Sequence, residues 1–277
     1  MHGPGLMVEE EAIGLVAGQG EFPLLFASTA KSLGKKVIGF GIEGCTDRRL
    51  EDFVAETHYV GLGELEKLLQ LFKEKKIRQV MLAGGIPKKE MYNPSFRMDS
   101  TARNLIDSGK NKGDDHLLRA FQIFLKIKCG ISILDSRVFL KNAMAPKGVL
   151  TTRKPSAQEW EDLRFGWKIA KGIGQMDIGQ TVVVKKGVVL AVEAIEGTDN
   201  AVKRGALLGQ GEVVVVKVCK PRQNLRFDLP CVGRDTLEAL KAGSSRVLGV
   251  EAGKTIMIFK EKLLEMANRE NMTFVGI

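Results

Sequence analysis

The chain has 277 residues, of which 44% are hydrophobic and 27% charged, and its formal net charge is +9. This length allows two domains, and no apolar run approaches the ~20 residues of a membrane span. The positive charge is spread over both halves without a basic tail, and only 6% of the residues are aromatic, so a nucleic-acid partner is not expected.

The N-terminal half alternates short apolar runs with stretches of helical periodicity. The expected strands are 12–17, 36–40, 79–83 and 131–134, and the expected helices are 23–33, 65–75 and 115–127. Strands that alternate with helices of this length predict a Rossmann-like parallel sheet covered on both faces.

Two glycine turns follow strands of this predicted sheet. Gly18 and Gly20 resemble the start of a dinucleotide fingerprint, but Pro23 stands where its third glycine belongs. Proline suits the first helical turn, and a glycine-rich turn before a helix can bind an anion. We therefore expect phosphate or sugar-phosphate binding here rather than a redox nicotinamide. Gly84 and Gly85 lie at the same carboxyl edge, where open α/β sheets bind ligands, with two tight turns as the alternative.

A further polar group precedes the helix at 115–127. Asp114 or Asp115 can cap this helix, but capping explains only one of the two acids and leaves Lys112 unexplained. All three are therefore candidate substrate-binding residues.

The alternation of strands and helices stops at 141–156. This segment is rich in proline, glycine and threonine, and we interpret it as a linker. The second half is predicted to be α+β. Its expected elements are a helix at 157–173, a hairpin of 181–184 and 188–194, strands at 213–219, 247–249 and 255–259, and a helix at 260–271. The sequence thus predicts a domain at 1–145 and a second, catalytic domain at 146–277.

Acidic residues cluster where the second hairpin strand ends. This strand delivers Glu193 and Glu196 to its end, Gly197 turns the backbone, and Thr198 or Asp199 is expected to cap the next helix. Acids beside exposed helix N–H groups can hold a hydrated cation and a phosphate together. The alternative is a capped helix with solvated acids.

Other polar residues occupy apolar surroundings in this half. Lys217 ends a strand of four valines, and Lys220 follows shortly after. Asp228 lies between apolar neighbours before a proline-set turn, where a partly buried carboxylate needs a metal or a cation as its partner. Gln180 leads into the hairpin, and together with Thr198 and the two lysines it is a candidate substrate-binding residue. The four cysteines show no C-x-x-C spacing, so zinc is not expected, and they are most simply reduced thiols in the cytoplasm.

Several of these segments together resemble one known family. The segments are A-G-x-G-x-x-P at 17–23, K-G-D-D at 112–115, D-I-G-Q at 177–180, A-x-E-G-T-D at 194–199 and D-L-P at 228–230. In this order they resemble the LpxI family of UDP-2,3-diacylglucosamine pyrophosphatases of lipid A biosynthesis. The resemblance departs at Gln19, where the family has glycine.

The resemblance implies two domains with the site in a chamber between them. It also implies Mg²⁺-dependent hydrolysis of UDP-2,3-diacylglucosamine to UMP and 2,3-diacylglucosamine 1-phosphate (lipid X), with Asp228 as the essential acid. Pyrophosphate hydrolysis needs a metal and cations for the developing charge. The acids offered by the sequence are Asp228, Glu193 and Glu196 for catalysis and Asp228, Glu196 and Asp199 for Mg²⁺ or Mn²⁺, and the cations are Lys217 and Lys220.

The expected location is the cytoplasm, with access to the cytoplasmic face of the inner membrane, because a basic surface suits an acylated substrate in an anionic leaflet. Whether the protein is a homo-oligomer is left open. Two other functions are kept: a phosphohydrolase or transferase for another nucleotide-activated sugar, and a nucleic-acid-binding module that rests on the +9 charge.

Overall fold

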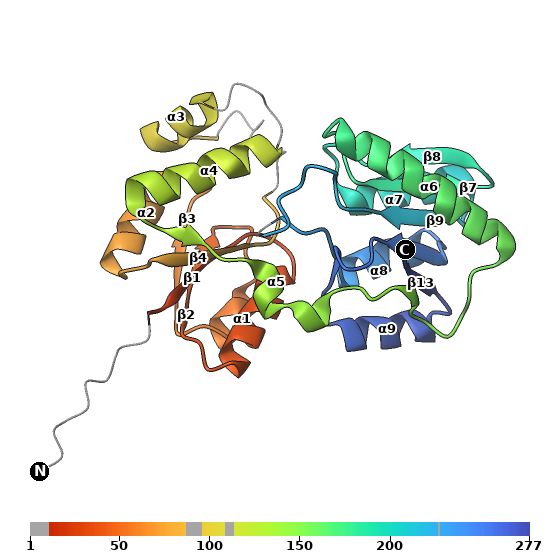
Figure 1. The fold of residues 1–277 in the computed structure, drawn as a ribbon, viewed down its shortest axis with the longest axis horizontal. Coiled ribbons are helices and arrows are strands. Elements are labelled where there is room, and N and C mark those ends of the chain that lie inside the picture. The colour runs from red at the N-terminus through yellow and green to blue at the C-terminus, as the bar shows by residue number, and fades with distance from the viewer. Residues whose placement is uncertain (1–10, 87–95, 109–113, 227) are drawn as a thin grey trace, which may run out of the picture. The chain divides into compact units, whose positions relative to one another are not determined.

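A computed structural model describes residues 11–86, 96–108, 114–226 and 228–277 (Figure 1). The chain divides into two compact units, which we describe one at a time. The first is formed mainly by the residues up to Leu134, and the second mainly by Asp135–Ile277. Within the described ranges, no helix combines the length and the apolar character needed to cross a bilayer.

The first unit is built on a five-stranded sheet in the order β3-β2-β1-β4-β5, and all of its neighbouring strands are parallel. The strands are β1 (Ile13–Ala17), β2 (Val37–Ile42), β3 (Glu56–Val60), β4 (Gln79–Ala83) and β5 (Ser132–Ile133). The predicted parallel α/β architecture is therefore confirmed.

Helices connect these strands and lie on both sides of the sheet. They are α1 (Phe22–Ser32), η1 (Arg48–Asp52), α2 (Leu65–Glu74), α3 (Ser100–Ser108) and α4 (Asp114–Cys129). Figure 1 shows α1 on one side of the strands and α2 and α4 on the other. Pro23 lies in the first turn of α1, as predicted, where its missing N–H costs no helical hydrogen bond.

The second unit contains a six-stranded mixed sheet in the order β6-β13-β11-β9-β7-β8. Its strands are β6 (Gly148–Val149), β7 (Thr181–Lys185), β8 (Val188–Val192), β9 (Val214–Lys217), β11 (Val247–Val250) and β13 (Thr273–Gly276). The predicted hairpin is β7–β8, closed by Lys186 and Gly187 at φ values of 49° and 75°. Two consecutive positive φ values match the right-handed twist of the paired strands.

The remaining elements of this unit are a small parallel pair of strands and several helices. The pair is β10 (Cys231–Val232) and β12 (Ile256–Met257). The helices are α5 (Ser136–Phe139), η3 (Lys141–Ala143), α6 (Ala157–Gln175), α7 (Thr198–Gly209), α8 (Arg234–Ala242) and α9 (Lys260–Arg269).

Two apolar cores flank the large sheet, because successive side chains of a strand point to opposite faces. Val182, Val184 and Val216 pack with the buried residues of α6 on one face. Val183 and Val215 pack on the other face with residues of α7, α8 and α9. The valine-rich strands are thus buried on both faces, which explains their continuous apolar runs.

Part of the predicted linker at 141–156 is regular structure that packs in the second unit. Within it, β6 pairs antiparallel with β13. Ala145 is 1% exposed, its amide donates to the carbonyl of Thr255, and its own carbonyl accepts from Gly253. These contacts tie the residues just before position 146 to the second unit.

Candidate active site

The centre of the candidate site is Lys217, at the carboxyl end of β9. Its side chain is only 7% exposed. Its ammonium group donates to Thr198 Oγ1 at 3.1 Å and to the carbonyl of Cys231 at 2.9 Å. The predicted lysine at the end of a buried strand thus holds the first residue of α7 and the start of β10 together.

Glu193 lies beside this lysine and is 9% exposed. It accepts a hydrogen bond from the Thr198 hydroxyl at 2.8 Å and one from the Gln180 amide at 3.3 Å. A Cβ on Gly179 would lie 2.0 Å from the Glu193 carbonyl oxygen, so only glycine permits this close approach. The segment 177–180 and the segment after β8, both singled out in the sequence, therefore pack against each other.

The predicted helix cap at Thr198 or Asp199 is wrong. The N-cap of α7 is Gly197, at φ 82°, and no side chain caps the helix. The Thr198 hydroxyl instead donates to Glu193, because the left-handed conformation of Gly197 places Thr198 inside the first turn, next to that buried carboxylate.

Asp199 is half-buried and lies within electrostatic reach of Lys217, Glu193 and Asp235. Burial raises the pKa of Asp199 above its ordinary value, because it penalises the charged form. Lys217 opposes this effect, whereas Asp235 and Glu193 add to it. Asp199 is thus a carboxyl group with an altered proton affinity in the first turn of a helix.

Glu196 makes a different set of contacts from the other acids. It forms an ion pair with Arg204 at 2.6 Å and accepts from the Ala194 amide at 3.1 Å. Burial alone would raise the pKa of Glu196, but Arg204 and the backbone hydrogen bonds together outweigh it, and the pKa falls below its ordinary value. These contacts bind Glu196 to Arg204 of α7 and to the backbone of Ala194, rather than to Lys217 or Glu193.

Lys220 and Gln180 are also placed near the end of β9. Lys220 is 8% exposed and forms a 2.7 Å ion pair with Asp177, the aspartate of the 177–180 segment. The Gln180 carbonyl accepts from the Val218 amide at 2.9 Å. Among the residues that the structure describes, none donates a hydrogen bond to its buried side-chain Oε1, which is unusual for a buried polar atom.

Asp228 is half-buried, and its amide donates to the Asn224 carbonyl at 3.0 Å. Burial raises the pKa of the Cys231 thiol to about 12; Lys217 lowers this pKa, whereas Asp228 raises it further. Asp228 therefore lies within electrostatic reach of Cys231, whose carbonyl Lys217 holds.

Among the described residues, no three His, Cys, Asp or Glu side chains are arranged to hold a metal ion. The predicted set of Asp228, Glu196 and Asp199 does not form such a group, and Glu196 is already paired with Arg204. Mg²⁺ is often held by one or two carboxylates together with substrate phosphates, which is a smaller requirement on the protein.

The glycine turns of the first unit bind each other. The Gln19 amide donates to the Gly85 carbonyl at 2.8 Å, and the Gly85 amide donates back to Gln19 at 3.1 Å. A Cβ on Gly18 would lie 2.3 Å from the Gly85 carbonyl oxygen, and Gly84 adopts φ 87°. These features match the tight-turn alternative. Gly20, at φ 89°, has open space where a Cβ would point.

The K-G-D-D segment can be placed only in part. Lys112 lies outside the described residues, and α4 begins at Asp114. The side chains of Asp114 and Asp115 are also outside the described part, so their predicted roles stay predictions.

Sequence reasoning missed Glu251, which directly follows β11 and is 6% exposed. It accepts from the Cys219 amide at 2.9 Å and pairs with Lys171 and Lys254. The signal was present in the sequence, since a charged residue directly follows a buried strand here just as one ends β9 at Lys217.

The chain was compared with known proteins. The family model of the LpxI N-terminal domain matches residues 12–143, and that of the LpxI C-terminal domain matches residues 146–275. UDP-2,3-diacylglucosamine pyrophosphatase LpxI of Caulobacter vibrioides is 30% identical over 276 residues, which cover 96% of this chain and 97% of that protein.

Two solved structures show low similarity to parts of this chain. The biotin carboxylase domain of Hydrogenobacter thermophilus 2-oxoglutarate carboxylase, bound to ADP, covers 72% of this chain and 41% of its own, with 15% identity and a TM-score of 0.29. A biotin carboxylase domain of a thermophilic 2-oxoglutarate carboxylase covers 57% of this chain and 33% of its own, with 18% identity and a TM-score of 0.25.

Proposed function

The chain belongs to the LpxI family, and on this premise we propose that it hydrolyses the pyrophosphate bond of UDP-2,3-diacylglucosamine in lipid A biosynthesis. The proposed products are UMP and 2,3-diacylglucosamine 1-phosphate. The proposed setting is the cytoplasm, at the cytoplasmic face of the inner membrane.

The observation that carries the proposal is the convergence of separate segments on Lys217. Thr198 belongs to the 194–199 segment, and Glu193 contacts both Thr198 and the 177–180 segment. Lys220 adds a second buried cation, held by Asp177. Buried cations beside carboxylates suit a substrate that carries two phosphates and gains charge at the leaving oxygen.

We assign the residues roles from their surroundings. Lys217 and Lys220 attract and orient the phosphates, and Glu193 positions Thr198. Asp228 accepts a proton from the attacking water, whose oxygen forms a new bond to one phosphorus while the bond from that phosphorus to the bridging oxygen breaks. The departing phosphate keeps the bridging oxygen, so the two products together contain one added water.

We also propose that the reaction requires Mg²⁺, with Mn²⁺ as a substitute. Asp199 and Asp228 are the carboxylates we expect to hold it together with the phosphates, since Glu196 is engaged by Arg204. When bound, the metal would neutralise phosphate charge.

Incubation with UDP-2,3-diacylglucosamine and Mg²⁺, followed by mass spectrometry, tests the proposal. We expect equal amounts of UMP and 2,3-diacylglucosamine 1-phosphate, and much slower hydrolysis of a UDP-sugar without acyl chains. Preference for the non-acylated sugar would instead support the alternative of an enzyme for another nucleotide-activated sugar.

A further inference from the structure

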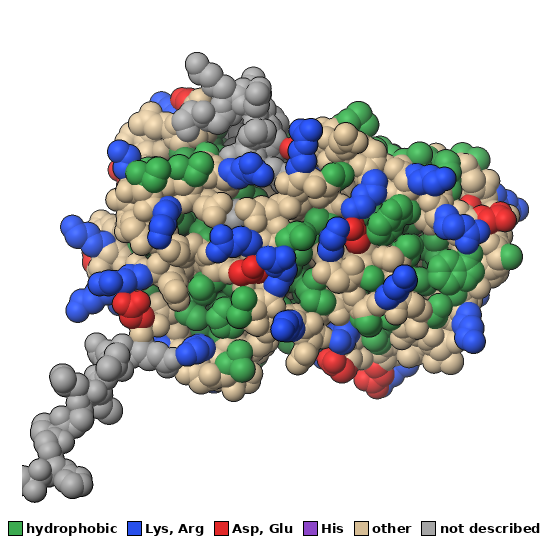
Figure 2. Space-filling model, in the orientation of Figure 1, with side chains coloured by type: hydrophobic (Ala, Val, Ile, Leu, Met, Phe, Trp, Pro, Cys, Tyr) green, Lys and Arg blue, Asp and Glu red, His purple; other side chains and the backbone are tan. Residues whose placement is uncertain are grey.

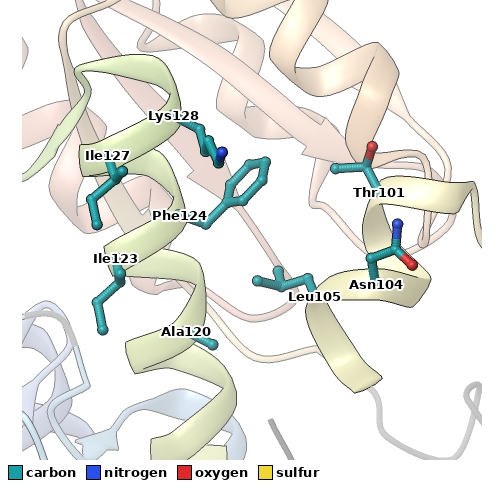
Figure 3. Close-up of a pocket in the computed structure, with 8 residues that line it drawn as sticks. All are labelled: Thr101, Asn104, Leu105, Ala120, Ile123, Phe124, Ile127 and Lys128. Atoms are coloured by element: carbon teal, nitrogen blue, oxygen red, sulfur yellow. The ribbon is translucent and has the colours of Figure 1, made fainter. Parts of the chain in front are cut away.

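Helices α3 and α4 of the first unit enclose an open groove of about 490 Å³ (Figure 3). Its walls are mostly apolar, and its polar side chains are two from α3 and one lysine from α4. The large apolar side chains are those of Leu105 on α3 and of Ile123, Phe124 and Ile127 on α4. The groove is large enough for an apolar ligand or anchor of ordinary size.

The outer side of α4 carries large apolar side chains into solvent. Ile123 is 58% exposed and Ile127 is 72% exposed. They are four residues apart and therefore lie on the same face of the helix. Figure 2 shows hydrophobic side chains gathered over α4. Leu125, between them in sequence, is fully buried, so α4 has one side in the core of the unit and an apolar stripe outside.

Basic residues surround this stripe. From 117 to 129, α4 contains Arg119, Lys126 and Lys128 and no acidic residue. All three basic side chains are exposed. A helix whose exposed apolar residues are flanked by lysine and arginine is typical of proteins that lie on a membrane surface. The acids of the two helices, Asp107 on α3 and Asp114 and Asp115 at the start of α4, lie outside the range 117–129. The three positive charges within that range favour an anionic partner.

We propose that the α3–α4 face docks on an anionic lipid bilayer. Ile123 and Ile127 enter the interface between headgroups and acyl chains, and Arg119 and Lys128 lie at the level of the lipid phosphates. The purpose of this contact rests on the proposed function, because a substrate with two acyl chains resides in a membrane. The contact itself is measurable without any turnover.

The test is flotation of the full-length protein with phosphatidylcholine vesicles, with and without phosphatidylglycerol. We expect binding only to the anionic vesicles, and weaker binding as salt is raised. Ile123→Asp/Ile127→Asp and, separately, Arg119→Gln/Lys128→Gln should each lower the partition coefficient by more than about tenfold. The second pair leaves Ile123 and Ile127 in place, so it keeps the test valid if the first pair alters folding.

Matched controls come from the second unit. Leu207 and Leu208 are exposed on α7, at 81% and 61%, and Lys147 and Lys154 are exposed outside any helix. Leu207→Asp/Leu208→Asp and Lys147→Gln/Lys154→Gln should stay within about twofold of the unmodified protein.

Equal binding of the α4 variants and the parent protein would overturn the proposal, and so would equal binding to both kinds of vesicle. Self-association that the isoleucine variant abolishes, in a protein that does not float with vesicles, would show that a second copy covers this face. Vesicle binding without hydrolysis would contradict the proposed function alone, whereas hydrolysis without vesicle binding would contradict the docking surface alone.

Discussion

Glu251 accepts a hydrogen bond from the Cys219 amide at 2.9 Å, and this contact joins the residue after β11 to the segment that leaves β9. Lys171, from α6, pairs with the same carboxylate and also donates to the Cys219 carbonyl at 2.8 Å. One buried carboxylate thus fixes the course of the backbone between Lys217 and Lys220. The Glu251 amide also donates to the Lys217 carbonyl at 3.3 Å, so the role of Glu251 is to position this backbone.

We expect Glu251→Gln to lower the free energy of unfolding by about 1–3 kcal/mol, because charge-assisted hydrogen bonds become neutral ones. Burial alone would raise the pKa of Glu251, but hydrogen bonds from Lys171 and Lys254 lower it below the ordinary 4.5. The charged carboxylate therefore stabilises the fold above about pH 4.5, and this contribution is lost as the pH falls through the lowered value. In urea unfolding between pH 7 and pH 3, the free energy of unfolding should fall less with decreasing pH for the variant than for the unmodified protein. The same decrease in both proteins would contradict the prediction.

Asp228→Asn should leave the fold intact and reduce turnover at least about 10²-fold, as is typical for loss of an acid–base or ligand role. Turnover is measured with the lipid substrate, and circular dichroism checks the fold. Glu238→Gln on the exposed side of α8 is the charge-matched control and should keep full activity. A folded Asp228→Asn protein with near-normal turnover would reject the assignment.

Lys217→Met should affect both turnover and stability. Loss of the cation should lower turnover at least about 10²-fold. The Cys231 carbonyl and the Thr198 hydroxyl lose a donor, which should cost about 1–3 kcal/mol of unfolding free energy. Lys262→Met, at an exposed position of α9, should change neither quantity greatly. A stable Lys217→Met enzyme with normal turnover would remove Lys217 from the site.

Exhaustive treatment with EDTA should abolish hydrolysis, and added Mg²⁺ or Mn²⁺ should restore it, because oxygen ligands favour hard divalent cations. Asp199→Asn should raise the Mg²⁺ concentration needed for half-maximal activity more than Glu196→Gln does, since Glu196 is bound to Arg204. Full activity after EDTA treatment would end the idea of a metal requirement.

A fragment of residues 135–277 should be more stable than one of residues 146–277. The longer fragment retains buried Ala145 and its hydrogen bonds to Thr255 and Gly253. Burial of backbone groups without partners is costly, so the shorter fragment should unfold at a lower urea concentration. Equal midpoints would show that the contacts of residues 135–145 contribute little.

Apolar periodicity was sufficient to predict most of the fold, including the parallel sheet around β1 and the β7–β8 hairpin. It failed for β3, a partly exposed edge strand whose sequence E-T-H-Y-V alternates polar and apolar residues only weakly. It also failed for α8, whose short amphipathic stretch falls between two regions of apolar strand. Both elements are stabilised by contacts with segments distant in sequence, which a local pattern does not record.

The candidate site was predicted in part. The burial of Lys217 followed from its position at the end of a valine strand, and the structure places Glu193 and Thr198 beside it. The pairing of Glu196 with Arg204 and of Lys220 with Asp177 was not predictable, because it depends on how α7 and the 177–180 segment pack. Spacing along the chain shows which charges are present, but not which ones neutralise each other.

The turn at Gly18–Gly20 has a consequence for which positions can vary. Gly18 has no room for a side chain, and Gly20 and Gly84 need their positive φ values, whereas Gln19 contributes through its backbone amide and carbonyl. Substitution of the side chain at position 19 therefore costs the fold little stability. This accounts for glutamine where the family resemblance predicts glycine. We expect a mutational scan to accept many residues at position 19 and to reject nearly all at position 18.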